Sequence, residues 1–165
     1  MSKSNTQFID VIDEENNNLF VADREDVYKK KLRHRIVHVL LETEGKMACQ
    51  VRSDKMSFCP GCYSTSVGGH VDSGETVEAA ARREMKEEIG KSAIVELIFS
   101  TWFEINGLRK LLFVFSADVK PPFNLSKDEV DRIEYLTYDE IKNIPKNKIH
   151  PELKFIVEKL NENNN

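Results

Sequence analysis

The chain has 165 residues, 40% of them hydrophobic, which suits one domain of ordinary size with a single core and does not suggest a disordered chain. Its 24 basic and 28 acidic residues are mixed along the chain and leave a formal net charge of −4, so charge alone gives no reason to expect nucleic-acid binding. No apolar run is long enough to span a bilayer or resembles a secretory signal, and an odd number of cysteines argues against a disulfide framework, so we expect a cytoplasmic protein without a membrane partner.

The N-terminal part of the chain is predicted to be an extension that packs on the main domain. Apolar runs at 8–12 and 19–21 flank a polar turn, a pattern typical of a hairpin or a pair of edge strands. A charged stretch at 23–31 connects them to the body and is compatible with a helical turn. We therefore divide the chain into an extension at 1–30 and one domain at 31–160.

The main domain contains strands on both sides of a central helix. Strands are predicted at 36–41, 47–51, 94–103, 111–119 and 130–136. The best helix is predicted at 77–89, a capping box opens a short helix at 137–140, and His150-Pro151 opens a final helix. Asn106-Gly107 is typical of a hairpin turn. This order indicates a mixed α/β domain, followed by a disordered tail at 161–165.

The predicted central helix carries three carboxylates that crowd one face. Glu84, Glu87 and Glu88 stand at positions i, i+3 and i+4, which share one side of a helix. Thr76 can cap the start of this helix and Gly90 can end it, so the segment is well marked as a helix. A divalent cation would compensate the charge, because magnesium and manganese prefer hard oxygen ligands. The alternative is a solvated face of unpaired acids, which is the commoner meaning of a charge run.

The sequence before these acids changes that balance. It reads Gly69-His70-Val71-Asp72-Ser73-Gly74-Glu75, then seven residues, then Arg83-Glu84-Met85-Lys86-Glu87-Glu88-Ile89-Gly90. This pattern resembles the Nudix box at every fixed position except the last, where Lys91 replaces an apolar residue. A match at this many spaced positions is far more specific than a lone glycine motif. The resemblance covers most of 35–140 and implies the Nudix α/β/α sandwich around a central mixed β-sheet.

By this resemblance, the chain is a magnesium-dependent hydrolase that cleaves a diphosphate bond in a nucleoside diphosphate linked to another group. The implied metal ligands are the carbonyl of Gly68 and the carboxylates of Glu84, Glu87 and Glu88, and manganese could replace magnesium. Glu75 and Arg83 are implied to brace the loop against the helix, because the planar fork of arginine fits a carboxylate.

The proton acceptor and the substrate stay open in the sequence. Glu88 could accept the proton of the attacking water, and Glu129 or Glu134 on a later loop could do so instead. The partner is expected to be a small-molecule diphosphate, and a homodimer is one arrangement that the sequence leaves open.

Substrate selectivity is expected to lie in loops such as 53–64 and 120–128, which a single sequence does not decode. Arg52 ends a predicted strand, and Trp102 or Phe103 could contact a base or a phosphate. For the two aromatic residues a core position is favoured, since buried strands commonly carry them.

Cys59-Pro60-Gly61-Cys62 could be a redox pair or half of a zinc site. A structural role is favoured, because no second pair has the same spacing and because Cys49 and His70 have no supporting spacing.

A second resemblance concerns the type I isopentenyl diphosphate isomerases, which share the Nudix fold. His34 and His70 are similar to residues of that branch, where a catalytic cysteine precedes the box glycine. Gly68 stands at that position here, and a gapless alignment places Leu108 and Lys110 where the branch has a pair of glutamates. Isomerase chemistry is therefore a disfavoured alternative, as is a catalytically silent nucleotide- or metal-binding module.

Overall fold

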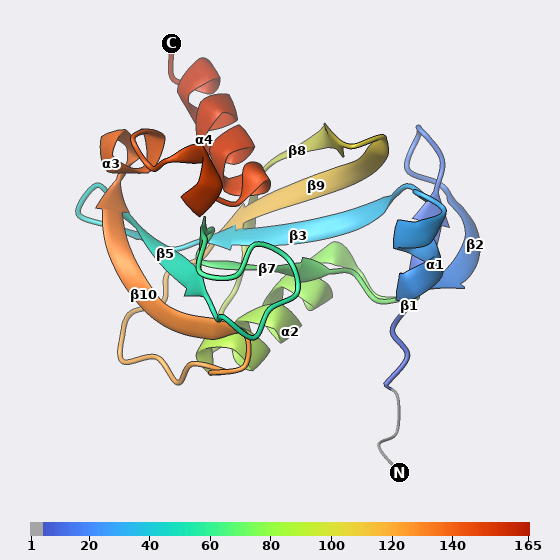
Figure 1. The fold of residues 1–165 in the computed structure, drawn as a ribbon, viewed down its shortest axis with the longest axis horizontal. Coiled ribbons are helices and arrows are strands. Elements are labelled where there is room, and N and C mark those ends of the chain that lie inside the picture. The colour runs from blue at the N-terminus through green and yellow to red at the C-terminus, as the bar shows by residue number, and fades with distance from the viewer. Residues whose placement is uncertain (1–4) are drawn as a thin grey trace.

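A computed structural model describes residues 5–165, which form two four-stranded sheets and an N-terminal hairpin (Figure 1). The mixed sheet contains, in spatial order, β7 (Val67–His70), β3 (His34–Leu40), β9 (Leu108–Ser116) and β8 (Glu96–Ile105). Its central strands β3 and β9 are parallel. The antiparallel sheet contains β10 (Val130–Thr137), β5 (Lys46–Arg52) and β4 (Glu42–Thr43), with β6 (Tyr63–Ser64) also paired to β5. The hairpin pairs β1 (Phe8–Ile12) with β2 (Asn18–Asp23).

The helices cover both faces of the mixed sheet and make the predicted α/β/α sandwich. They are α1 (Arg24–Lys29), α2 (Val77–Ile89), α3 (Tyr138–Lys142), the short 3₁₀ helix η1 (Lys146–Lys148) and α4 (Pro151–Asn163). Helices α2 and α4 lie on opposite sides of β3 (Figure 1). Among residues 5–165, no helix has both the length and the apolar character needed to cross a membrane. Helix α4 continues to Asn163, so most of the segment that we expected to be a disordered tail is helical.

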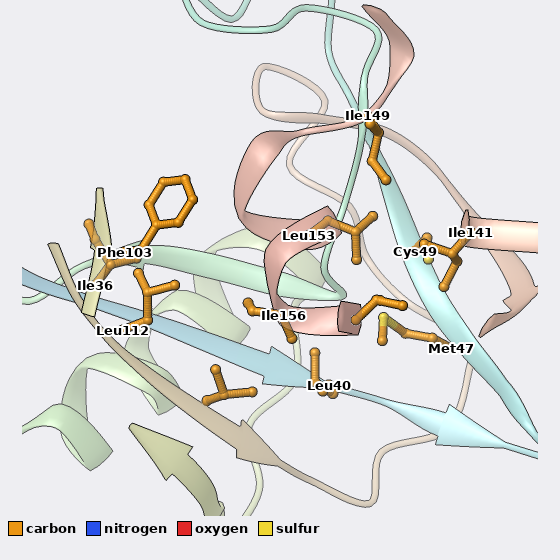
Figure 2. Close-up of a cluster of buried hydrophobic side chains, with 12 residues drawn as sticks. Ile36, Leu40, Met47, Cys49, Phe103, Leu112, Ile141, Ile149, Leu153 and Ile156 are labelled. Atoms are coloured by element: carbon orange, nitrogen blue, oxygen red, sulfur yellow. The ribbon is translucent and has the colours of Figure 1, made fainter. Parts of the chain in front are cut away.

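The α4 side of the mixed sheet holds a core of large apolar side chains. Leu153 and Ile156 of α4 are fully buried against Leu40 of β3 and Met47 of β5 (Figure 2). Each such side chain contributes about 1.5–3 kcal/mol relative to exposure. This packing sets α4 firmly on the sheet, so that the first turn of the helix lies at a fixed place against β3.

The α2 side of the sheet is packed with small side chains. Ala80 and Ala81 are fully buried against Val37 and Val39 of β3, together with Met85. Because alanine has so short a side chain, the helix axis approaches the sheet closely here. The next turn of α2, which carries the acids, is thereby held against β7.

Local signals of the sequence are confirmed at both ends of α2 and at one hairpin. The Thr76 hydroxyl accepts a hydrogen bond from the Ala79 amide at 3.1 Å, and Gly90 adopts the left-handed conformation with φ of 72°. Asn106-Gly107 joins β8 to β9. The strands around this turn are displaced from their predicted bounds, because the turn pairs Ile105 directly with Leu108 and so starts β9 earlier.

One strand of the mixed sheet, β7, was not among the predicted elements. Gly68 and Gly69 lie in β7, which pairs antiparallel with β3. Glycine weakens a strand on its own, so the local sequence hides this element. Pairing with His38 and Val37 of β3 holds Gly68 and Gly69 in the extended conformation, which the glycines would not favour by themselves.

Candidate active site

The site lies where α2 meets β7. Glu84 and Glu88 are on the side of α2 that faces the sheet, and only 8% and 4% of their surfaces are exposed. A Cβ atom built on Gly69 would lie 2.2 Å from the Glu84 carboxyl carbon. Only glycine leaves room for that carboxyl, so this box position is explained by close approach of a side chain to the backbone.

Glu88 is held by two donors from different parts of the chain. Its Oε1 accepts a hydrogen bond from Gln50 Nε2 at 2.8 Å, and its Oε2 accepts one from the Gly68 amide at 3.2 Å. Gln50 comes from β5 and is buried. Both sheets therefore orient one carboxylate.

The two buried carboxyls resist ionisation. Burial raises the pKa of Glu84 to about 7, against the opposing effect of Arg83, and the charge of Glu87 raises it further. Burial raises the pKa of Glu88 well above its usual range, and the neighbouring Glu84 adds to the rise. A positive ion between these groups would favour their charged forms, offsetting both the cost of burial and the mutual repulsion.

Arg83 links the box loop to the helix. Its Nε and Nη2 donate to the two oxygens of Glu75 at 2.8 and 2.9 Å, and Nη2 also donates to the His70 carbonyl at 3.0 Å. Its Nη1 donates to Glu84 at 2.9 Å and to Glu87 at 3.3 Å. Glu87 itself is exposed and stands at the outer edge of the cluster.

The N-terminal hairpin forms hydrogen bonds with the box loop between β7 and α2. Asp10 accepts hydrogen bonds from the Ser73 hydroxyl at 2.8 Å and the Gly74 amide at 3.1 Å, and the Ser73 amide donates to the Phe8 carbonyl at 2.8 Å. The only hint in the sequence is that Asp10 interrupts an apolar run. We did not predict this contact.

The charges around the cluster differ in sign. Burial raises the pKa of Glu129, which lies on the loop before β10, and the charge of Glu87 raises it further. Burial lowers the pKa of Arg52, and the negative charges of Glu88 and Glu129 oppose that shift. The Nε of Arg52 donates a hydrogen bond to the Phe58 carbonyl at 3.0 Å. Acidic and basic groups from three segments of the chain therefore influence one another's ionisation.

Glu134, the other candidate proton acceptor, is engaged elsewhere. Its carboxylate accepts from the Tyr63 hydroxyl at 2.7 Å and from Arg132 at 2.8 Å. The two aromatic candidates lie at the far side of the mixed sheet, on β8. Phe103 packs against Phe155 in the core, as expected. Trp102 was also expected in the core, but it is only half-buried and lies under the Arg109 guanidinium.

The family can be assigned from comparison with known proteins. The sequence model of the NUDIX domain family matches residues 31–156, well over half of the chain. The chain belongs to the Nudix family. The uncharacterised Nudix hydrolase YfcD of Escherichia coli K12 is 32% identical over 140 residues, which cover 84% of this chain and 78% of that protein.

Solved structures share the Nudix fold. The DR0079 protein of Deinococcus radiodurans superposes with a TM-score of 0.80 at 24% identity, over 93% of this chain and 98% of that one. A MutT protein of Methanosarcina mazei Go1 has a TM-score of 0.69 at 20% identity, over 80% of this chain and 95% of that one. At these identities the likeness concerns the fold alone.

The Nudix acids fit a magnesium ion. Within residues 5–165, no three histidine, cysteine or carboxylate side chains converge closely enough to enclose an ion by themselves. Magnesium needs no such cage, because it is usually held by one or two carboxylates together with waters and substrate phosphates. Glu84 and Glu88, seated beside the backbone of Gly68 and Gly69, supply hard oxygen donors of that kind.

The histidines of the second resemblance are packed together beside this site. His34 is fully buried, its Nδ1 lies 2.9 Å from the Leu32 carbonyl oxygen, and its ring stacks on His70 at 5.6 Å between centroids. Burial lowers the pKa of His34 to about 4, so this ring is neutral near pH 7. Lys110 pairs with Glu152 at 2.9 Å.

The cysteine pair corrects one expectation. Cys59 and Cys62 form a disulfide, although the odd cysteine count argued against such bonds. Count and spacing could not show this, because the bond depends on a tight turn in which Cys59 and Gly61 both have positive φ and the two Cα atoms lie 5.5 Å apart.

Proposed function

We propose that this Nudix protein hydrolyses a diphosphate bond in a nucleoside diphosphate linked to another group, with magnesium as its metal. One observation carries the proposal. Two buried carboxylates, Glu84 and Glu88, lie against a glycine pair that leaves space for them, at a spacing that matches the Nudix box. Two adjacent buried acids that are costly to ionise contribute little to the stability of the fold. Their oxygens are, however, the kind of ligand that a divalent cation prefers.

The metal would be held by Glu84 and Glu88, with the Gly68 carbonyl as a backbone ligand and Glu87 at the exposed edge. Bound magnesium would neutralise phosphate charge and acidify the attacking water. The protein's own part is to keep the carboxylates in place. Gln50 and the Gly68 amide do this for Glu88, and Arg83 does it for Glu84.

We assign proton acceptance from the attacking water to Glu129. Hydrogen bonds from Gln50 and the Gly68 amide fix both oxygens of Glu88 in place, which suits a metal ligand. Burial raises the pKa of Glu129, and a carboxyl with a raised pKa holds a transferred proton better near neutral pH. Arg52, which feels the charges of Glu88 and Glu129, is placed to contact a phosphate oxygen.

The test is a screen of diphosphate compounds with and without magnesium, using the wild type, Glu88→Gln and Glu78→Gln. Glu78 lies on the same helix in an exposed position, so its variant controls for loss of charge. We expect magnesium-dependent release of a phosphate-containing product, a loss of roughly 100-fold or more in Glu88→Gln, and normal turnover in Glu78→Gln. Glu88→Gln should melt close to the wild type, because burial already favours the neutral form of this carboxyl and glutamine is a neutral side chain of the same shape.

Two results would contradict the proposal. One is turnover in Glu88→Gln at the wild-type rate. The other is release of product that does not depend on a divalent ion. Double-bond migration without phosphate release would point to the isomerase alternative.

A further inference from the structure

A buried ionic network lies on the face of the mixed sheet that packs against α4. Glu152 in the first turn of α4 places its Oε2 2.8 Å from His38 Nε2 and its Oε1 2.9 Å from Lys110 Nζ. Only 2% of His38 and 4% of Glu152 are exposed. Burial alone would raise the pKa of the Glu152 carboxyl, but the hydrogen bond from His38 and the charge of Lys110 hold it well below its usual range.

Hydrogen bonds connect this network to the segment that leads into β7. The Thr65 hydroxyl lies 2.7 Å from His38 Nδ1 and donates to the Val67 carbonyl at 3.1 Å. The His38 ring is thus bonded to Thr65 through Nδ1 and to Glu152 through Nε2. These contacts link the ring to α4 on one side and to the strand that carries Gly68 on the other.

Stability does not account for such a network. Burying ionised groups costs several kcal/mol per ion, and replacing a buried pair by apolar residues is often neutral or stabilising. The neighbours of His38 on the same face of β3, Ile36 and Leu40, are both aliphatic. A purely structural site would be served as well by another aliphatic side chain.

The network touches the backbone that orients the acids. His38 pairs with Gly68 in the β3–β7 ladder, and a Cβ atom on Gly68 would lie 3.1 Å from His38 Nδ1. The amide of the same Gly68 donates to Glu88 on the other side of the strand. The peptide at Gly68 is thus held between the imidazole of His38 and the carboxylate of Glu88.

We propose that His38 and Glu152 are positioning residues that fix the Val67–Gly68 backbone and, through it, Glu88 and the metal. Glu152 fixes the orientation of the His38 imidazole ring, and the ring and Thr65 fix the position of the strand backbone. The amide of Gly68 on that strand then fixes the orientation of the Glu88 carboxylate. The proposal rests on the proposed function for its metal, but the backbone part of it can be tested without metal. It makes the first turn of α4 part of the site, although that turn lies on the opposite face of the sheet from α2.

The experiment compares the wild type with Glu152→Gln, His38→Gln and the matched control Ile156→Val. Ile156 lies in the same helix and the same core, and the loss of one methylene there costs about 0.5–1.5 kcal/mol without touching the network. Two readouts are needed. The first is amide hydrogen exchange at Gly68 in the metal-free protein. The second is Mn²⁺ binding without substrate, followed by the electron paramagnetic resonance signal of the free ion.

We expect Gly68 exchange to accelerate at least 10-fold in both network variants relative to other amides of the same sheet. Mn²⁺ affinity should fall by roughly 10–100-fold, the usual effect of losing a residue that orients a metal ligand. Ile156→Val should match the wild type in both. Wild-type exchange and affinity in the network variants would overturn the inference. Accelerated exchange in a protein that binds no Mn²⁺ would support the positioning role and refute the proposed function.

Discussion

Gly69→Ala tests whether the glycine pair exists to make room for a metal ligand. The added Cβ would lie 2.2 Å from both the carboxyl carbon and Oε1 of Glu84. Non-bonded carbon atoms rest at about 3.5–4.0 Å, so the carboxyl must retreat by roughly 1.3 Å. Gly69 lies in strand β7 and does not have a positive φ, so alanine is compatible with its backbone. The strain therefore falls on Glu84 and not on the chain at Gly69.

A displacement of this size has a calculable effect on turnover. A misplacement of about 1 Å at a reacting centre can cost roughly 100-fold in rate. We expect Gly69→Ala to lose about that factor in kcat and to bind Mn²⁺ more weakly, while unfolding cooperatively with a loss of about 1–3 kcal/mol in stability. The assays are magnesium-dependent turnover of a diphosphate compound and Mn²⁺ titration.

The matched control is Gly45→Ala. Gly45 lies in the turn between β4 and β5, has φ of 74°, and has no atom within 4 Å of an added Cβ. Its alanine variant should lose about 1–2 kcal/mol from backbone strain and keep full turnover per folded molecule. If Gly69→Ala showed the same pattern as Gly45→Ala, the close approach to Glu84 would have no role in catalysis and the reasoning would be refuted.

Three further predictions concern single residues. Glu129→Gln should lower kcat by roughly 100- to 10,000-fold with unchanged Mn²⁺ affinity, and wild-type turnover would remove Glu129 as the proton acceptor. Asp10→Ala removes the acceptor of two hydrogen bonds to the box loop, so the free energy of unfolding in urea should fall by about 1–3 kcal/mol; an unchanged midpoint would contradict this role of Asp10. The pKa of His34 is lowered to about 4, so protonation favours the unfolded chain, and the wild type should lose about 3 kcal/mol between pH 6.5 and pH 4 relative to His34→Phe. Parallel pH profiles of the two proteins would contradict this.

The parts of the site that the sequence predicts are those made by neighbours along the chain. Helix α2 begins at the cap Thr76 and ends at Gly90 because these signals act within one turn. The spacing of Glu84 and Glu88 puts both on one side of that helix for the same reason. Arg83 and Glu87 lie four residues apart, so the same periodicity brings them together, and their side chains are 3.3 Å apart.

The parts that escaped prediction depend on contacts between distant segments. Gln50 of strand β5 donates a hydrogen bond to Glu88 of helix α2, and the two residues are 38 positions apart in the sequence. Asp10 reaches Gly74 across 64 positions, and an aspartate in an apolar run does not reveal its partner. Strand β7 exists because β3 pairs with it, whereas its glycines alone favour a loop.

The central claim is that Glu84 and Glu88 hold a divalent ion against the Gly68 backbone. The most direct measurement is anomalous X-ray diffraction from crystals of the full chain equilibrated with Mn²⁺. We predict one strong anomalous peak within direct coordination distance of both carboxylates and the Gly68 carbonyl oxygen. Crystals saturated with Mn²⁺ that show no peak between these carboxylates, or an ion bound only elsewhere, would contradict the account.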